Sequence, residues 1–132
     1  MLFRFGPDSG GEPAPLIIIA LVDEITGQAV PNLSAFVDTG ADGTILPLQL
    51  LQDAGFLPNR QRRRFYTAQS DHPPEIVIGY SVSLHIGEFV LYDIDVYASR
   101  TVTEVILGRD VLNQLVFTYD GPQRLLAITN LE

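Results

Sequence analysis

Short apolar segments separated by turn signals recur through most of the chain. They are rich in Ile, Val, Phe and Tyr and follow one another about every ten residues. Residues 16–22 and 33–37 are almost continuously apolar, as expected for strands that are buried on both faces. This spacing is typical of a small all-β barrel or sandwich.

The middle of the chain has a clear period of two, which predicts a long strand over residues 75–86. Its apolar face would consist of Ile76, Ile78, Tyr80, Val82, Leu84 and Ile86. A tight reversal at Gly87-Glu88 leads into a second strand. We expect Val90, Tyr92, Ile94 and Val96 to share one face of that strand. Near the end, residues 115–119 and 124–129 flank Asp120-Gly121-Pro122-Gln123, which predicts a further hairpin.

Two short helices and one flexible segment complete the predicted organisation. A helix over residues 48–54 begins near Pro47 and ends at Gly55. A second helix covers residues 110–115, where the side chain of Asp110 would cap the first turn. Residues 6–15 contain three prolines and three glycines. We therefore expect a flexible lead-in over residues 1–15 and one domain over residues 16–132.

Composition restricts the function classes. The chain has 132 residues, enough for one modest core, and a formal net charge of -8, which disfavours a nucleic-acid partner. It has no cysteine, so disulfides and thiol catalysis are excluded. The longest apolar run, residues 16–22, is too short to span a membrane, and we expect a cytoplasmic protein. All eight cations are arginines, with four at positions 60, 62, 63 and 64. This cluster is either a solvated edge or a surface that steers acidic substrates.

The candidate chemistry lies at Asp38-Thr39-Gly40, directly after the apolar segment 33–37. A carboxylate at the end of a rigid strand can activate water when a second carboxylate shares one proton with it. The hydroxyl of Thr39 would bond across to a partner loop, and Gly40 would let backbone approach closely. Asp8-Ser9-Gly10 has the same pattern but follows Gly6-Pro7, so we interpret it as a turn.

The surroundings of Asp38 resemble the retropepsin-like aspartic peptidases, the family of the retroviral proteases and their bacterial relatives. The loop Asp38-Thr39-Gly40-Ala41, followed by Thr44-Ile45-Leu46, is similar to the active-site loop of that family. A β-rich middle segment stands where the family has its flap. Ile106, Leu107 and Gly108, followed by an apolar helix, are similar to the family's second hydrophobic motif. The resemblance spans residues 16–115 and implies a small closed barrel with one or two short helices.

The same resemblance implies an aspartic endopeptidase that needs two chains and no cofactor. The chain is too short for two lobes, so a homodimer would pair Asp38 with its symmetry mate around a peptide substrate. The resemblance also implies that Arg109 pairs with Asp42 to brace the loop, and that Asp42 reaches the substrate main chain. In retroviral members the termini interleave across the dimer, whereas this chain continues through the hairpin predicted after residue 115.

The flap is the second departure from the family's pattern. The matching residues include Tyr66, Thr67, Ala68, Gln69, Ser70, Asp71, His72 and Pro73. The tip at residues 70–74 has two prolines and no glycine, which predicts a stiffer or more open flap. A retropepsin-like dimerisation or peptide-binding module without useful turnover therefore remains an alternative. His72 and His85 lack ligand spacing, so we expect no metal site.

Overall fold

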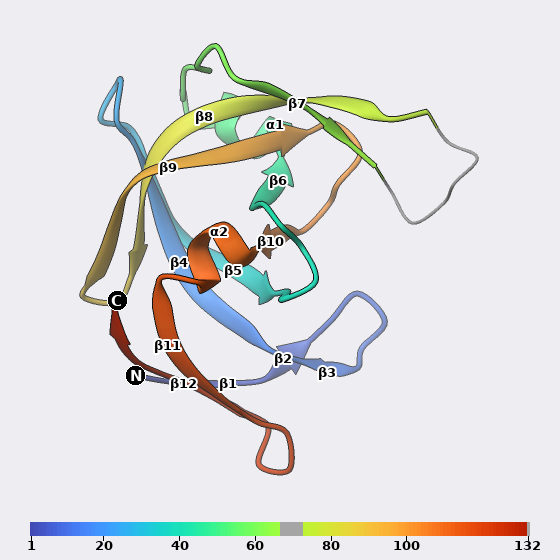
Figure 1. The fold of residues 1–132 in the computed structure, drawn as a ribbon, viewed down its shortest axis with the longest axis vertical. Coiled ribbons are helices and arrows are strands. Elements are labelled where there is room, and N and C mark those ends of the chain that lie inside the picture. Colours follow the sequence, from blue (N-terminus) through green and yellow to red (C-terminus); the bar gives the residue numbers. More distant parts are fainter. Residues whose placement is uncertain (67–72, 132) are drawn as a thin grey trace.

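The computed structural model describes residues 1–66 and 73–131. In chain order the elements are β1 (Leu2–Arg4), β2 (Gly6–Pro7), β3 (Pro13–Ala14), β4 (Leu16–Asp23), β5 (Ala29–Val37), β6 (Ile45–Pro47), α1 (Leu48–Asp53), β7 (Arg62–Phe65), β8 (Glu75–Ile86), β9 (Phe89–Ser99), β10 (Val105–Leu107), α2 (Arg109–Leu112), β11 (Leu115–Asp120) and β12 (Leu125–Leu131). Figure 1 shows a barrel of strands, with α2 near the centre of the view beside β10.

The barrel is closed by six strands in the order β4-β5-β10-β6-β9-β8, because β8 pairs back onto β4. The seventh strand, β7, adds to the free edge of β8. Side chains fill the interior, and the fully buried ones include Leu21, Leu46, Val82, Leu84, Val96 and Leu107. Burial of each such side chain contributes about 1.5–3 kcal/mol. The predicted all-β barrel with two short helices is confirmed.

A β-bulge in β9 changes which side chains of that strand face the core. Asp93 has a positive φ of 56°. The pairing shifts here, so that two residues of β9 oppose one residue of β8. Consequently Leu91 is buried and Tyr92 is 70% exposed. The prediction that Tyr92 shares the inward face of Ile94 and Val96 was wrong, because strict alternation does not continue through a bulge.

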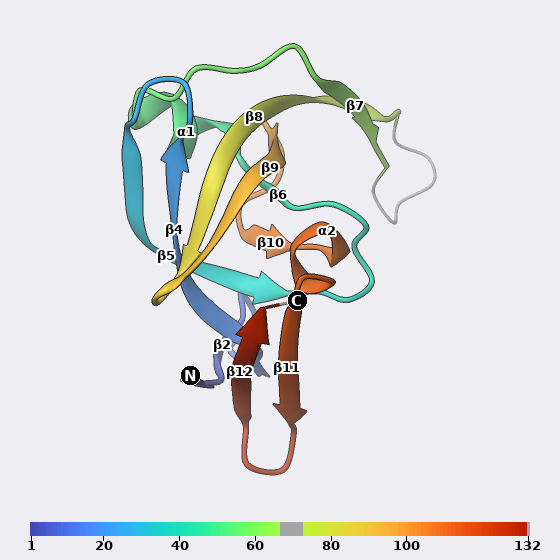
Figure 2. The same ribbon diagram turned by 60° about the vertical axis from the view of Figure 1, so that its left-hand side comes forward.

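The two ends of the chain form a separate three-stranded sheet in the order β1-β12-β11. Figure 2 shows the β11–β12 hairpin extending away from the barrel. The hairpin agrees with the sequence prediction, but residues 1–15 differ from the predicted flexible lead-in. β1 pairs along β12, and the amino group of Met1 donates to the carbonyl oxygen of Ile128 at 2.8 Å. Phe3 and Phe5 pack against the core, which offsets the low structural propensity of the Gly/Pro-rich residues that follow.

Both helices are short and differ from prediction at their ends. α1 ends at Asp53, and Gly55 has the left-handed φ of 77° expected after a helix. α2 ends at Leu112 because the chain enters β11 only three residues later. The helix starts one residue earlier than predicted, with Gly108 at the N-cap position, but Oδ1 of Asp110 accepts a hydrogen bond from the first-turn amide of Val111 at 2.9 Å. Within the two described ranges, no helix has the length and apolar character needed to cross a membrane.

Candidate active site

The two sequence motifs lie side by side in the barrel. β5 runs parallel to β10, with Phe36 opposite Ile106 and Val37 opposite Leu107. Asp38 is the residue directly after β5, and its amide donates to the carbonyl oxygen of Leu107 at 3.0 Å. The second motif therefore fixes the backbone from which the Asp38 side chain projects.

The carboxylate of Asp38 is oriented by its own loop. Its Oδ1 accepts a hydrogen bond from the amide of Gly40 at 2.9 Å. The amide of Ala41 donates to the main-chain carbonyl of Asp38 at 3.2 Å. A Cβ at Gly40 would stand 3.1 Å from the same Oδ1, tighter than nine in ten real Cβ contacts, so a side chain here would press on the Asp38 carboxylate. Asp38 is half-buried, and Thr39 beside it is exposed.

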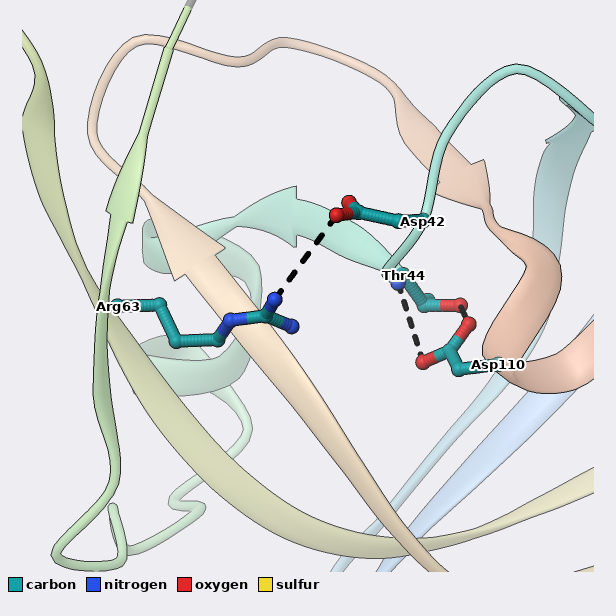
Figure 3. A network of polar contacts seen from close by, with 4 residues as sticks. All are labelled: Asp42, Thr44, Arg63 and Asp110. Atoms are coloured by element: carbon teal, nitrogen blue, oxygen red, sulfur yellow. Dashed lines mark hydrogen bonds and ion pairs between the residues drawn. The ribbon is translucent and has the colours of Figure 1, made fainter.

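A buried hydrogen-bond network joins the active-site loop to α2. Thr44 is 1% exposed, and its hydroxyl donates to Oδ1 of Asp110 at 2.8 Å. The amide of Thr44 donates to Oδ2 of Asp110 at 3.2 Å, and the amide of Gly108 donates to the Thr44 hydroxyl oxygen at 3.2 Å. Figure 3 shows Thr44 and Asp110 facing each other. The sequence placed Thr44 in the motif, but it did not reveal Asp110 as its partner.

Close backbone packing completes this junction. A Cβ added to Gly108 would come within 2.5 Å of the carbonyl oxygen of Gly43, so no side chain fits there. The amide of Arg109 donates to the carbonyl of Ala41 at 2.8 Å, and its Nη1 donates to the carbonyl of Thr39 at 2.9 Å. Arg109 thus contacts the loop through main-chain carbonyls.

Asp42 has a different partner from the one that the sequence predicted. Among the residues that the structure describes, its ion pair is with Arg63, at 3.9 Å, and not with Arg109 (Figure 3). The reason is geometric: Arg109 is already bonded to the Thr39 carbonyl, whereas Arg63 comes from β7 on the opposite side of the cleft. Sequence analysis noted Arg63 as one of a cluster but gave it no individual role.

A cleft of about 390 Å³ opens beside Asp38. The active-site loop, residues 38–45, forms one side, and residues 63–66 of β7 and its extension form the other. Val77, Tyr97 and Ile106 complete the lining. Of the predicted flap residues, Tyr66 lines this cleft and Pro73 is exposed. Thr67, Ala68, Gln69, Ser70, Asp71 and His72 lie outside the described residues.

The base of the predicted flap is held by Glu75, the first residue of β8. Its carboxylate accepts hydrogen bonds from the Ser99 hydroxyl at 2.7 Å, the Thr101 hydroxyl at 2.8 Å and the Arg100 amide at 2.7 Å. Partial burial raises the pKa of Glu75, but these hydrogen bonds and the charge of Arg100 together outweigh it and hold the pKa below its ordinary value. The sequence indicated no individual role for the Glu75 carboxylate.

His85 and Asp95 lie outside the cleft lining and contact neighbouring polar side chains. The ring of His85 lies 3.3 Å from the Ser83 hydroxyl, on the barrel wall. Asp95 accepts a hydrogen bond from the amide group of Asn59 at 3.1 Å. Across residues 1–66 and 73–131, His, Asp and Glu side chains form no group of three that could hold a metal ion.

Three solved structures with a similar fold are two aspartic proteases and a retroviral protease-like domain. A retropepsin-like aspartic protease from Rickettsia conorii has 19% identity and a TM-score of 0.62, over 97% of this chain and 89% of that chain. The protease of EIAV, solved with the inhibitor HBY-793, has 18% identity and a TM-score of 0.53, over 77% and 88%. The retroviral protease-like domain of Ddi1 from Leishmania major has 16% identity and a TM-score of 0.50, over 88% and 90%.

Sequence comparison identifies the family directly. No curated protein sequence matches the chain. Residues 24–114, however, match the family model described as "gag-polyprotein putative aspartyl protease". This range contains both motifs, and it accounts for more than half of the 132 residues. With the barrel and the Asp38 loop placed as described, the chain belongs to the retropepsin-like aspartic proteases.

Proposed function

We propose that the chain is an aspartic endopeptidase that works as a homodimer. The observation that carries this proposal is the placement of Asp38: its carboxylate leaves the end of a core strand, is oriented by the Gly40 amide, and borders a cleft. The loop is tied to the second motif by buried bonds, so the carboxylate is preorganised, as a catalytic group must be.

The proposed reaction uses two Asp38 carboxyl groups, one from each chain, that share one proton. The ionised carboxylate takes a proton from a water molecule whose oxygen attacks the scissile carbonyl carbon. The protonated carboxyl donates a hydrogen bond to the carbonyl oxygen as negative charge develops there. The tetrahedral intermediate then collapses, the C–N bond breaks, and a proton passes to the leaving amine. No covalent enzyme intermediate and no cofactor take part.

A two-fold contact around Thr39 would bring these carboxyl groups together. Thr39 is exposed beside Asp38, so its hydroxyl is accessible to a partner loop. The terminal strands are already paired within one chain, since β12 lies between β1 and β11. We therefore expect the active-site loops to form the centre of the interface, in place of the interleaved termini of retroviral members.

Peptide cleavage by wild type and Asp38→Asn from pH 4 to pH 7 tests the proposal. The wild type should cleave best at mildly acidic pH, because one carboxyl of the pair must stay protonated. Asp38→Asn should lose cleavage by at least about 10³-fold while it keeps its dimer mass in solution. Cleavage that persists in Asp38→Asn would show that another group is the catalyst.

The alternative is a peptide-binding or dimerisation module on the same fold. The two adjacent prolines at 73–74 motivate it, because a stiff flap would hinder closure over a substrate. This alternative predicts that wild type and Asp38→Asn bind peptides equally and that neither cleaves them. Product analysis by mass spectrometry, combined with a binding measurement on the same peptides, separates the two functions.

A further inference from the structure

Arg63 directs a positive charge into the cleft from the side opposite Asp38. It lies on β7 directly across from Val77, a buried residue that lines the same cleft. Neighbouring residues on a strand point to opposite faces. Accordingly Arg62, one position earlier, turns away and donates to the carbonyls of Asn59 at 2.8 Å and Gln61 at 2.7 Å.

The guanidinium of Arg63 is held in place but not neutralised. It lies over the ring of Tyr97, with 5.2 Å between its Cζ and the ring centroid, and stacking of this kind fixes the guanidinium plane. Its contact with Asp42 is 3.9 Å long, beyond hydrogen-bond length. The side chains of the pair are 50% and 78% exposed, so water weakens the attraction. Considering residues 1–66 and 73–131, donors of Arg63 therefore remain available to a ligand.

We propose that Arg63 makes this cleft select peptides that carry an acidic side chain beside the bond to be cleaved. The inference rests on the proposed function, since it names the substrate class of the same site. A carboxylate of the substrate would take the place that Asp42 now occupies, and it could bind the planar guanidinium through two parallel hydrogen bonds. A bound peptide would also exclude water and strengthen the attraction.

The overall charge of the protein does not prevent this preference. The chain carries a net charge of -8, which repels an acidic peptide at a distance. At physiological salt, however, charges further apart than about 8 Å are largely screened. Within the cleft the lining carries the carboxylates Asp38 and Asp42 as well as Arg63, so the preference depends on direct contact with the Arg63 guanidinium.

The test compares matched peptides that differ in one group. We would use decapeptides of mixed sequence in which one position at a time is fixed as Glu or as Gln. Binding of these peptides is measured with full-length Asp38→Asn, and their cleavage is measured with wild type. At one position near the scissile bond, the Glu peptide should bind about fivefold more tightly than the Gln peptide and be cleaved about fivefold faster. This factor corresponds to the upper end of the range for a partly exposed ion pair. When Arg63→Gln is added, the Glu and Gln peptides should bind and be cleaved equally well. Arg62→Gln changes the net charge by the same amount as Arg63→Gln, but it should leave the preference for the Glu peptide unchanged.

The pH dependence provides an independent readout. The Glu-to-Gln ratio in binding should fall to one as the pH drops below about 4.3, where a glutamate of the peptide becomes protonated. Adding Arg63→Glu should reverse the preference, so that a Lys peptide binds better than its Gln counterpart. A structural role of Arg63 alone would change affinity for all peptides without this dependence on charge.

The outcomes separate the inference from the proposed function. A Glu preference in binding that Arg63→Gln removes supports the inference even if wild type cleaves nothing, in which case only the peptidase proposal fails. Equal binding of Glu and Gln peptides at every position overturns the inference, whether or not they are cleaved. Loss of the preference in Arg64→Gln but not in Arg63→Gln overturns the assignment to Arg63.

Discussion

Replacement of Thr44 by valine tests whether the loop that carries Asp38 depends on the second motif. Valine has nearly the same shape as threonine but carries a methyl group in place of the hydroxyl, so the change is not neutral in a buried polar site. Two hydrogen bonds disappear: the one donated to Asp110 at 2.8 Å and the one accepted from the Gly108 amide at 3.2 Å. The site is buried, with Thr44 1% exposed, so water does not replace them.

The expected cost is substantial for a single oxygen atom. A hydrogen bond to a charged carboxylate contributes about 1.5–3 kcal/mol, and a buried amide left without a partner costs about 1–3 kcal/mol. The two effects overlap, because Asp110 keeps its bonds from the amides of Thr44 and Val111. We therefore expect Thr44→Val to lower the free energy of unfolding by about 3 kcal/mol.

Urea unfolding at one fixed protein concentration measures this cost, since dimerisation would couple to unfolding. Thr129→Val is the matched control: its hydroxyl donates to the Val116 carbonyl at 3.3 Å from an exposed position. The control should cost about 0.5 kcal/mol or less, as exposed substitutions usually do. A loss below about 0.5 kcal/mol in Thr44→Val would refute the argument that buried bonds hold the loop.

Three further predictions concern the same region. Gly108→Ala should cost about 3 kcal/mol or more in urea unfolding, because its Cβ would stand 2.5 Å from the Gly43 carbonyl oxygen. Because the pKa of Glu75 is lowered in the folded protein, its carboxylate stabilises the fold at neutral pH. This stabilisation is lost as the pH falls from about 4.3, the ordinary pKa of a glutamate, through the lowered pKa of Glu75. The melting temperatures of Glu75→Gln and wild type should therefore converge over this pH range. Arg109→Met removes the 2.9 Å bond to the Thr39 carbonyl and should lower kcat of peptide cleavage about tenfold.

Each of these predictions has its own control and contrary outcome. Gly10→Ala, where a Cβ would meet only the Asp8 side chain at 3.4 Å, should leave stability nearly unchanged, and an equal loss in both glycine variants would contradict the packing argument. A constant gap between the Glu75→Gln and wild-type melting curves down to pH 3 would contradict the pKa argument. Arg124→Met is the control for Arg109→Met, because Arg124 is also exposed. An equal loss of activity in both variants would contradict the role of Arg109 in holding the active-site loop.

The catalytic candidate could be found from sequence only because of its context. Asp8 and Asp38 begin the same tripeptide pattern, and both make the same turn: Oδ1 accepts the amide of the glycine two residues later at 2.9 Å. Local geometry therefore does not distinguish them. What differs is the preceding segment, since Val37 ends a buried strand beside Leu107, whereas Asp8 lies between the two-residue strands β2 and β3. The apolar run before Asp38 was the decisive signal.

The features that sequence missed depend on contacts between distant residues. The bulge at Asp93 relies on a positive φ in a non-glycine residue, which no hydrophobic pattern encodes. The family resemblance implied Arg109 as the partner of Asp42, but Arg109 bonds to the Thr39 carbonyl and Arg63 of β7 pairs with Asp42, which only the three-dimensional path of β7 reveals. Residues 1–15 were expected to be flexible because of their glycines and prolines, but β1 pairs with β12 at the other end of the chain, a contact that local composition does not reveal.

The strand order of the terminal sheet bears on how two chains would form a dimer. A strand at a sheet edge offers unpaired amides and carbonyls to a partner, but β12 has β1 on one side and β11 on the other. Exchange of termini between chains would have to break the Met1–Ile128 bonds and uncover Leu126, which is 1% exposed. Pairing through Thr39 breaks none of these contacts. Pairing through Thr39 therefore leaves the terminal sheet intact, whose edge strands β1 and β11 can also pair with a partner. If the active-site loops form the centre of the dimer, assembly and catalysis depend on the same few residues.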